Sequence, residues 1–169
     1  DSTVVYAAAL TITGTHTLDN VGFLVAGAYT IANSNTLTVV GTLTLTDGSI
    51  AQTTIPATGS VSAQGNIVYA STFDGGTGRI EITGAVSQDF TGGGSATAGS
   101  LPDIEIDKSE GTLTLFSIIR IVDNYWTYTA GTLDATTNDS TVLFGIVNND
   151  IYITGTHTLD NVGFLVAGA

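Results

Sequence analysis

Apolar and polar residues alternate along much of the chain with a period of two. In the segment 42–46, Leu43 and Leu45 alternate with three Thr residues. The same alternation appears in seven further segments, which begin at residues 10, 36, 79, 103, 112, 141 and 151. Successive side chains of an extended chain point to opposite faces, so this pattern predicts strands with one buried and one exposed face. We therefore expect a β-strand at each of these segments.

The stretches between these segments are rich in Gly, Asn, Asp and Ser. These residues favour tight turns because they tolerate positive φ or bond locally to the backbone. Turn-forming stretches begin at residues 32, 47, 63, 74, 91, 122, 135 and 147. No window of the sequence shows the apolar stripe of an amphipathic helix. The pattern indicates an all-β chain of short strands.

Two architectures fit many short, evenly spaced strands. A β-sandwich is built from hairpins, which often contain Asn-Gly or Asp-Gly turns, and only Asp47-Gly48 and Asp74-Gly75 are of this type. A parallel β-helix instead uses short corners rich in Gly, Asn and Thr around a continuous Leu, Ile and Val interior. The sequence therefore favours a right-handed parallel β-helix, or solenoid, with the β-sandwich as the alternative.

One long stretch of sequence occurs twice. Ile12–Ala28 returns letter for letter as Ile153–Ala169, and the similarity extends back to Asp1 and Asp139. Core and surface positions both tolerate substitution, so a fold alone does not keep such a stretch identical. We predict that residues 1–138 form one repeat unit and that residues 139–169 begin a second copy. The alternative is a single domain whose two end strands match.

Charge is scarce and one-sided. The chain has 15 Asp and Glu residues against 3 Lys and Arg, for a formal net charge of -12. Such a field repels the phosphates of nucleic acids and of anionic membranes. No apolar run approaches the roughly 20 residues of a membrane-spanning helix. We therefore expect no nucleic-acid partner and no membrane insertion.

The chain contains neither Cys nor Met. The lack of Cys excludes disulfides and thiol chemistry. The lack of both sulfur residues suits an oxidising, extracellular or cell-surface setting. Because no Met is present, we expect Asp1 to lie within a longer translated product.

Two groups of residues are candidate binding sites. Asp103, Glu105 and Asp107 alternate along one predicted strand, so they share a face. Carboxylates are the ligands that Ca²⁺ prefers, but neighbours on a straight strand diverge, and the alternative is a solvated acidic face. Trp126 and Tyr128 also share a face, and aromatic rings can stack on sugars. The alternative for this pair is packing in the core or at an edge.

The sequence offers little for catalysis. His16 and His157 are one repeat position seen twice, with no acidic partner nearby in sequence. A Ser or Thr nucleophile needs both a base and an orienting acid, so we predict no enzymatic activity and, apart from the candidate Ca²⁺ ligands, no cofactor. A site like that of polysaccharide lyases needs a basic residue beside clustered carboxylates, and the basic residues here are scattered. Thr-x-Thr pairs resemble those of ice-binding solenoids, but they are spaced too irregularly for one flat array.

Four runs carry a resemblance to a known class: residues 12–23, 36–50, 71–84 and 128–145. Their composition and pattern resemble the tandem units of long bacterial surface proteins, the adhesin-like class similar to filamentous haemagglutinin. The resemblance implies a secreted stalk or fibre built of β-solenoid repeats. Our first hypothesis is therefore a non-enzymatic rod segment that self-associates end to end. The second is a module that binds a glycan or a host protein.

Overall fold

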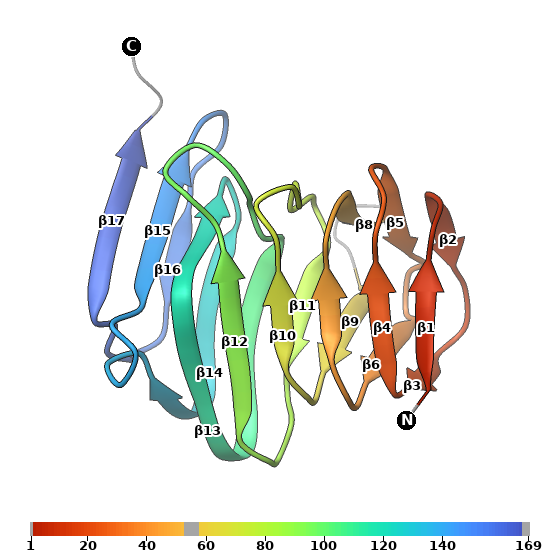
Figure 1. Ribbon diagram of the computed structural model, residues 1–169, viewed down its shortest axis with the longest axis horizontal. Helices are drawn as coiled ribbons and strands as arrows, with labels where there is room; N and C mark the ends of the chain where they lie inside the picture. Colours follow the sequence, from red (N-terminus) through yellow and green to blue (C-terminus); the bar gives the residue numbers. More distant parts are fainter. Residues whose placement is uncertain (1, 53–57, 167–169) are drawn as a thin grey trace.

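The computed structural model describes residues 2–52 and 58–166, and within these ranges the chain forms β-strands and no helix (Figure 1). No helix that could cross a membrane is therefore present in them. All eight segments predicted from the alternation are strands. The strands are β1 (Thr3–Tyr6), β2 (Leu10–Ile12), β3 (His16–Leu18), β4 (Asn20–Phe23), β5 (Ala28–Ile31), β6 (Thr36–Val39), β7 (Leu43–Leu45), β8 (Ser49–Gln52), β9 (Ser60–Ala63), β10 (Ile67–Tyr69), β11 (Arg79–Ile82), β12 (Gln88–Gly93), β13 (Asp103–Val122), β14 (Tyr125–Asp134), β15 (Thr141–Ile146), β16 (Tyr152–Thr154) and β17 (Asn161–Val166).

The strands wind into a parallel β-solenoid of about 7 turns. Every pairing among the described strands is parallel and joins strands from successive turns, such as β1 with β4 and β4 with β7. The front face contains β1, β4, β7, β10, β12, the second half of β13, β15 and β17, and the back face contains β3, β6, β9, β11, the first half of β13, β14 and β16. A third face holds β2, β5 and β8. The predicted solenoid is confirmed, and the sandwich alternative is wrong because consecutive strands do not pair as hairpins.

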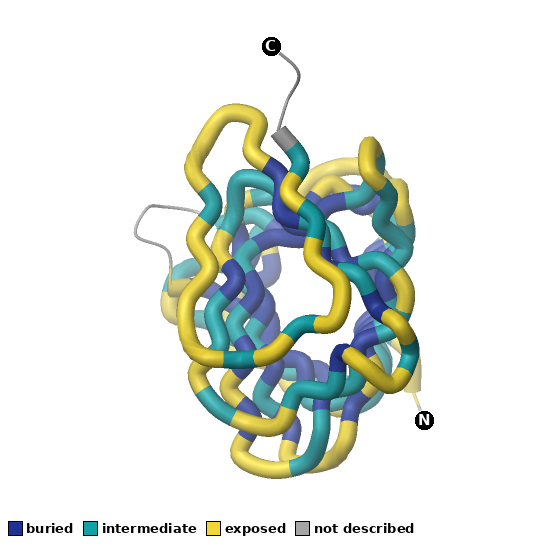
Figure 2. Tube along the Cα trace, turned by 90° about the vertical axis from the view of Figure 1, so that its left-hand side faces the viewer, coloured by how far each residue is buried: buried dark blue, intermediate teal, exposed yellow. Residues whose placement is uncertain are grey.

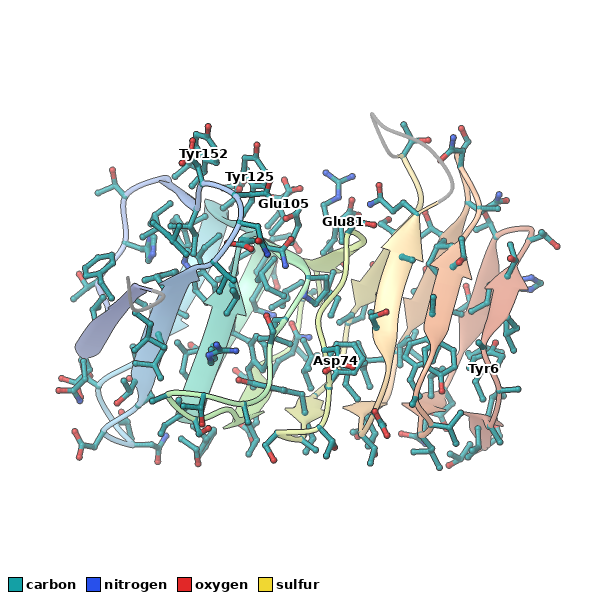
Figure 3. The ribbon with its side chains drawn as sticks, turned by 90° about the horizontal axis from the view of Figure 1, so that it is seen from above. Tyr6, Asp74, Glu81, Glu105, Tyr125 and Tyr152 are labelled. Carbon is teal, nitrogen blue, oxygen red and sulfur yellow. The ribbon has the colours of Figure 1, made fainter. Side chains whose placement is uncertain are left out.

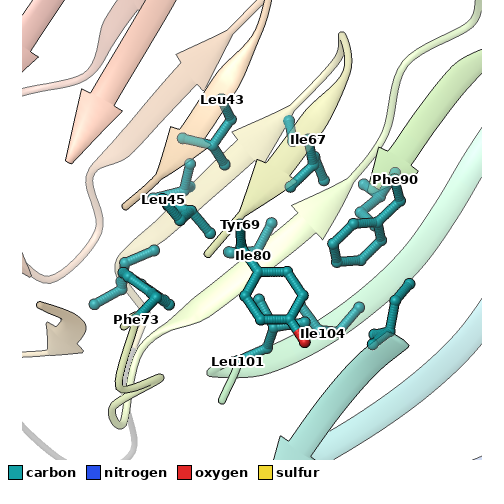
Figure 4. Close-up of a cluster of buried hydrophobic side chains, with 14 of the residues drawn as sticks. Leu43, Leu45, Ile67, Tyr69, Phe73, Ile80, Phe90, Leu101 and Ile104 are labelled. Atoms are coloured by element: carbon teal, nitrogen blue, oxygen red, sulfur yellow. The ribbon is translucent and has the colours of Figure 1, made fainter. Parts of the chain in front are cut away.

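The core is a continuous column inside the coil. Figure 2 looks along the coil and shows buried residues lining its inner side. On the front face, Val21, Leu43 and Ile67 occupy one register position in three successive turns, and each is at most 1% exposed. Figure 4 shows how such side chains from neighbouring turns pack together. The alternating Leu, Ile and Val of the sequence therefore stack turn upon turn, while the Thr residues between them face outward.

Strand β13 differs from the sequence prediction, which placed two strands in this segment. It runs without a break for 20 residues, first on the back face beside β11 and then on the front face beside β12. The bend lies near Gly111, whose φ is 70°. A Cβ at this position would lie 2.6 Å from the backbone carbon of Val86. Gly therefore allows the strand to turn the corner in close contact with the preceding turn.

Lys108 is buried at the same corner, with an exposure of 1%. Its ammonium donates hydrogen bonds to the carbonyl oxygens of Gly84 at 2.6 Å and Val86 at 2.9 Å, and also to Oε1 of Gln88. Burial lowers the pKa of Lys108 below its ordinary value. The side chain ties the bend of β13 to the corner one turn earlier, because it supplies donors to carbonyl groups that strand pairing does not satisfy.

Candidate functional site: the two ends of the solenoid

The repeated sequence forms the same strand pair at both ends of the solenoid. At the start, β1 pairs with β4 so that Val4 lies opposite Val21 and Tyr6 opposite Phe23. At the end, β15 pairs with β17 so that Val142 lies opposite Val162 and Phe144 opposite Phe164. The register is the same, although three residues are inserted between the strands, as the offset grows from 138 to 141. The front-face strand pair is therefore repeated in three-dimensional structure, but the stretch between the two strands is not: Ile12 lies in β2 on the third face, and its counterpart Ile153 lies in β16 on the back face.

The polar contacts at the start of these pairs repeat as well. The backbone N–H of Asn20 donates to the oxygen of Ser2 at 3.0 Å, and that of Asn161 donates to the oxygen of Ser140 at 3.3 Å. In each copy the Asn side-chain amide also donates to the same Ser oxygen, at 3.4 Å. The Oδ1 atom of Asn20 accepts the N–H of Thr42 from the following turn at 2.8 Å. The Asn therefore links three successive turns in the first copy.

The two copies differ in what lies beyond them. Strand β4 has β1 on one side and β7 on the other, whereas the described strand that pairs with β17 is β15. In the first copy Val21 is 1% and Phe23 0% exposed. In the second copy Val162 is 44% and Phe164 69% exposed. The C-terminal end of the solenoid therefore presents to solvent the side chains that the same sequence buries in its first copy.

The ring contacts show the same difference. Phe23 stacks on Tyr6 with a centroid distance of 5.4 Å and also contacts Tyr29 at 4.5 Å. Phe164 stacks on Phe144 at 5.9 Å. Phe144 occupies the repeat position of Tyr6, so Phe164 keeps the contact with the preceding turn. In the first copy the additional contact comes from Tyr29, which directly follows the repeated stretch.

The N-terminal end is a hollow rather than a projection. A depression of about 340 Å³ opens there. Its apolar walls are formed by the first turn and include Val4, Tyr6, Leu10, Ile12 and Leu18. Tyr6, Leu10 and Leu18 are partly buried and pack against the core. These side chains therefore lie on the outer side of the first described turn.

The repeat diverges at its His position. His16 lies in β3 and its Nε2 is 2.8 Å from the oxygen of Thr13, whereas His157 lies outside any strand. There Trp126 Nε1–H donates to Nε2 of His157 at 2.9 Å, and the Tyr128 ring stacks on the imidazole at 5.2 Å. Burial lowers the pKa of His157 below its ordinary value. The sequence identity could not show this difference, because the partners come from β14.

Trp126 lies in the core, which is the alternative that the sequence left open for this pair. Its exposure is 0%, and it packs edge-on against Phe144 in the core, so no sugar can reach its face. Tyr128 packs against the core as well. The exposed aromatic pair is instead Tyr125 with Tyr152, each 47% exposed and stacked with centroids 4.8 Å apart. Alternation along β14 sends Tyr125 outward while its neighbour Trp126 faces inward.

The three carboxylates of β13 lie on the outer side of the back face, but each has a different environment. Asp103 accepts the N–H of Tyr125 at 2.8 Å, and burial raises the pKa of its carboxyl group. Glu105 pairs with Arg79 at 3.2 Å, and Arg79 also contacts Glu81 at 2.7 Å. Asp107 is exposed. The described residues contain no group of three or more His, Cys, Asp or Glu that could hold a metal ion.

These outward residues form a row across successive turns. Figure 3 shows Tyr152, Tyr125, Glu105 and Glu81 one after another along the back face. A depression of about 230 Å³ lies beside Tyr125 and is lined by Arg79, Asp103, Glu105 and Thr127, among others. An aromatic ring thus borders several charged and hydroxyl groups. The row mixes the two kinds of group that contact sugars in proteins.

The Thr-x-Thr pairs fall on different faces, as their irregular spacing predicted. Thr11 lies in β2 on the third face, Thr36 and Thr38 in β6 on the back face, and Thr44 in β7 on the front face. A flat ice-binding array needs its pairs in one column, so these pairs do not form one.

The Gly-rich stretch 91–100, whose first three residues belong to β12, borders the polar groove of the third face with its remaining part. The groove has a volume of about 560 Å³, and Thr97, Gly99, Arg120 and Asp123 are among its lining residues. Arg120 donates to the oxygen of Gly99 at 2.5 Å. Asp123 accepts the N–H groups of Val147 and Asn148, and these bonds help to lower its pKa. Hydrogen bonds therefore connect the residues that line the groove.

Comparison of the chain with protein-family models, curated proteins and solved structures finds no match.

Proposed function

We propose that this chain is a non-enzymatic structural segment of an extracellular rod, stalk or fibre made of tandem copies of the same unit. The observation that carries the proposal is the shared register of β1–β4 and β15–β17. Because the front-face pair at the end of the unit reproduces the pair at its beginning, a following copy can continue the front sheet in the same register. The sulfur-free composition and the resemblance to bacterial surface repeats support the extracellular setting.

The geometry gives the length that each copy adds. Six pairing steps lead from β1 to β15, through β4, β7, β10, β12 and β13. Strands in a sheet lie about 4.8 Å apart, so one unit adds roughly 29 Å of rod. Each turn buries the apolar face of its neighbour, so the rod gains stiffness and stability turn by turn.

A tandem chain tests the proposal. Residues 29–169 are appended after Ala169, so that the second unit follows the first in the order that the repeat sets. Small-angle X-ray scattering should show that the maximum dimension grows by about 29 Å while the cross-section stays constant. The control carries the same addition with the order of residues 29–52 scrambled. Two bodies joined by a linker, with the same profile for both chains, would contradict a continuous rod.

A second candidate function is carbohydrate binding at the row around Tyr125. The exposed Tyr125–Tyr152 stack beside Asp103 and Arg79 favours it, since the rings offer apolar faces and the charged groups offer hydrogen bonds. Glycan-array binding should then be lost in Tyr125→Ser and kept in Val86→Ser, which changes an exposed residue away from the row. Equal binding by both variants would remove this candidate.

A further inference from the structure

We propose that the polar groove of the third face binds a small zwitterion of the α-amino-acid class, with its carboxylate on Arg120 and its ammonium group on Asp74. Corner loops on the side of the coil line this groove, so a rod of tandem copies would leave it accessible. The inference therefore goes beyond the proposed structural role, which assigns no ligand to this face.

The groove lies where the third face changes from strands to loops. The regular sheet of this face ends at β8, and single bridges such as Gly48–Phe73 and Asp74–Ser100 continue it. The lining residues come from four successive turns, in the stretches 71–77, 97–100, 120–124 and 147–149. The groove has a volume of about 560 Å³. Small-molecule sites in proteins have volumes of about 300–1,000 Å³, so the groove has the size of a ligand site.

Arg120 brings a positive charge into the groove without a carboxylate partner of its own. A guanidinium carries several N–H donors, and the described residues supply an acceptor for one of them, the carbonyl oxygen of Gly99 at 2.5 Å. The Nε atom is buried without a hydrogen-bond partner among these residues. Arg79 differs, since it forms ion pairs with Glu81 and Glu105, whereas Arg120 forms none with a described residue. Unpaired donors of a charged group are costly, and a carboxylate can accept two of them in parallel.

Asp74 brings the opposite charge from the preceding turn. Its backbone bridges to Ser100, so it lies one strand spacing, about 4.8 Å, from the loop that holds Arg120. Its carboxylate is exposed and forms no hydrogen bond or ion pair with a described residue. Figure 3 shows Asp74 away from the row that contains Tyr125, so the groove is separate from that row. Arg120 and Asp74 therefore line one groove without pairing with each other, and a ligand with neighbouring opposite charges can pair with both.

The charge balance favours a zwitterion over a simple ion. The net charge of -12 repels a free anion, and Arg120 opposes a free cation beside Asp74. A zwitterion carries no net charge and meets neither penalty. Asp123, the other acidic residue of the groove, already accepts two backbone N–H groups, so Asp74 is the partner for the ammonium group. Thr97 and Asn124 also line the groove, so we expect amino acids with polar side chains to bind best.

An NMR titration of the isotope-labelled chain at pH 7 with L-serine measures the binding. The backbone amide signals of Gly99, Ser100 and Asn124 should shift, and the shifts give the dissociation constant. Two derivatives of the probe each keep one of its charges. N-acetyl-L-serine keeps the carboxylate, and L-serine methyl ester keeps the ammonium group. Each should bind at least about tenfold more weakly than L-serine, because each loses one charge-assisted contact.

Charge-removing variants assign the two contacts. Asp74→Asn and Arg120→Gln should each raise the dissociation constant of L-serine at least about tenfold. Arg79→Gln is the matched control, because it removes the same charge as Arg120→Gln from the back face and should change the constant less than about twofold. Circular dichroism reports folding, and Asp74→Asn alters an exposed side chain, so it tests the site even if Arg120→Gln does not fold.

The outcomes separate this inference from the proposed function. Shifts at the groove that Asp74→Asn weakens and Arg79→Gln preserves support the site. The absence of shifts at millimolar L-serine overturns it, as does equal weakening by Asp74→Asn and Arg79→Gln. Binding of N-acetyl-L-serine as tight as that of L-serine also overturns it, because the groove would then hold a simple anion. None of these results changes the scattering of the tandem chain, so the rod stands or falls on its own test.

Discussion

The repeat allows one substitution to be tested twice in the same sequence context. Phe23 and Phe164 occupy the same position of the repeat, in the same strand register, and differ in whether a following turn covers them. Replacement of each by Ala removes the same atoms. The difference in the free energy of unfolding therefore measures what the covering turn contributes.

The burial of each Phe side chain sets the expected loss in the free energy of unfolding. Phe23 is 0% exposed, and truncation of a buried Phe to Ala costs about 3–5 kcal/mol through lost burial and the cavity left behind. Phe164 is 69% exposed, so about a third of its burial energy is lost, or roughly 0.5–1 kcal/mol. Phe164 also lies in a terminal turn, which can open locally before the rest of the solenoid unfolds. We expect Phe23→Ala to be the more destabilising change by about 3 kcal/mol.

Urea unfolding followed by circular dichroism gives both values at a protein concentration below that of self-association. Losses at the two positions that agree within about 0.5 kcal/mol would refute the reasoning, since burial would then not depend on the following turn. A second measurement at high concentration adds a check. If copies dock, Phe164→Ala should become more costly there, because the wild-type side chain gains a partner.

Three further outcomes are expected. Burial lowers the pKa of His157, so the unfolded chain binds the proton first and the terminal turn should lose stability as the pH falls below about 6.5. The fluorescence emission of Trp126, the only Trp, should change in this pH range, because Trp126 donates a hydrogen bond to His157. The change should persist in His16→Gln and vanish in His157→Gln. Lys108→Met keeps the side-chain volume but leaves the oxygens of Gly84, Val86 and Gln88 without this donor. Urea titrations should show that the free energy of unfolding falls by about 2–4 kcal/mol. An unchanged free energy of unfolding would contradict the role of the ammonium. Burial raises the pKa of Tyr69 from 10.0 to about 12, so the unfolded chain ionises first and the free energy of unfolding should fall by about 2 kcal/mol as the pH rises from 10 to 12. Thermal melts should show a clearly smaller decline in Tyr69→Phe, and an equal decline in both chains would contradict this assignment.

Local alternation predicted seven of the seventeen described strands, and in a strand such as β7 it also predicted which face is buried; the other ten strands carry too weak an alternation to be predicted in this way. Leu43 and Leu45 face inward and the Thr residues between them outward, as the period of two requires. The same rule placed Trp126 and Tyr125 on opposite faces. It could not show that Tyr125 stacks on Tyr152, because that contact joins strands from different turns. It also could not show that Arg79 bridges Glu81 and Glu105.

Contacts between turns depend on how many residues each corner uses, and the sequence pattern does not state this number. The long strand β13 is an example, since alternation broke at Lys108–Gly111 and suggested two strands. The structure carries the strand through the corner because Gly111 adopts positive φ and Lys108 bonds to the turn below. Both residues act through contacts with the neighbouring turn, since Gly111 lies against the backbone of Val86 and Lys108 donates to the oxygen of Gly84.

The sequence by itself determined that this is an all-β chain of stacking strands that repeats its own beginning. The tertiary structure decided which copy of the repeat is covered. Phe23 and Phe164 stand in identical stretches, yet one is buried and the other is 69% exposed. The physical reason is that alternation selects the face of a strand, whereas burial requires a second strand beyond it, and that strand comes from the next turn of the coil.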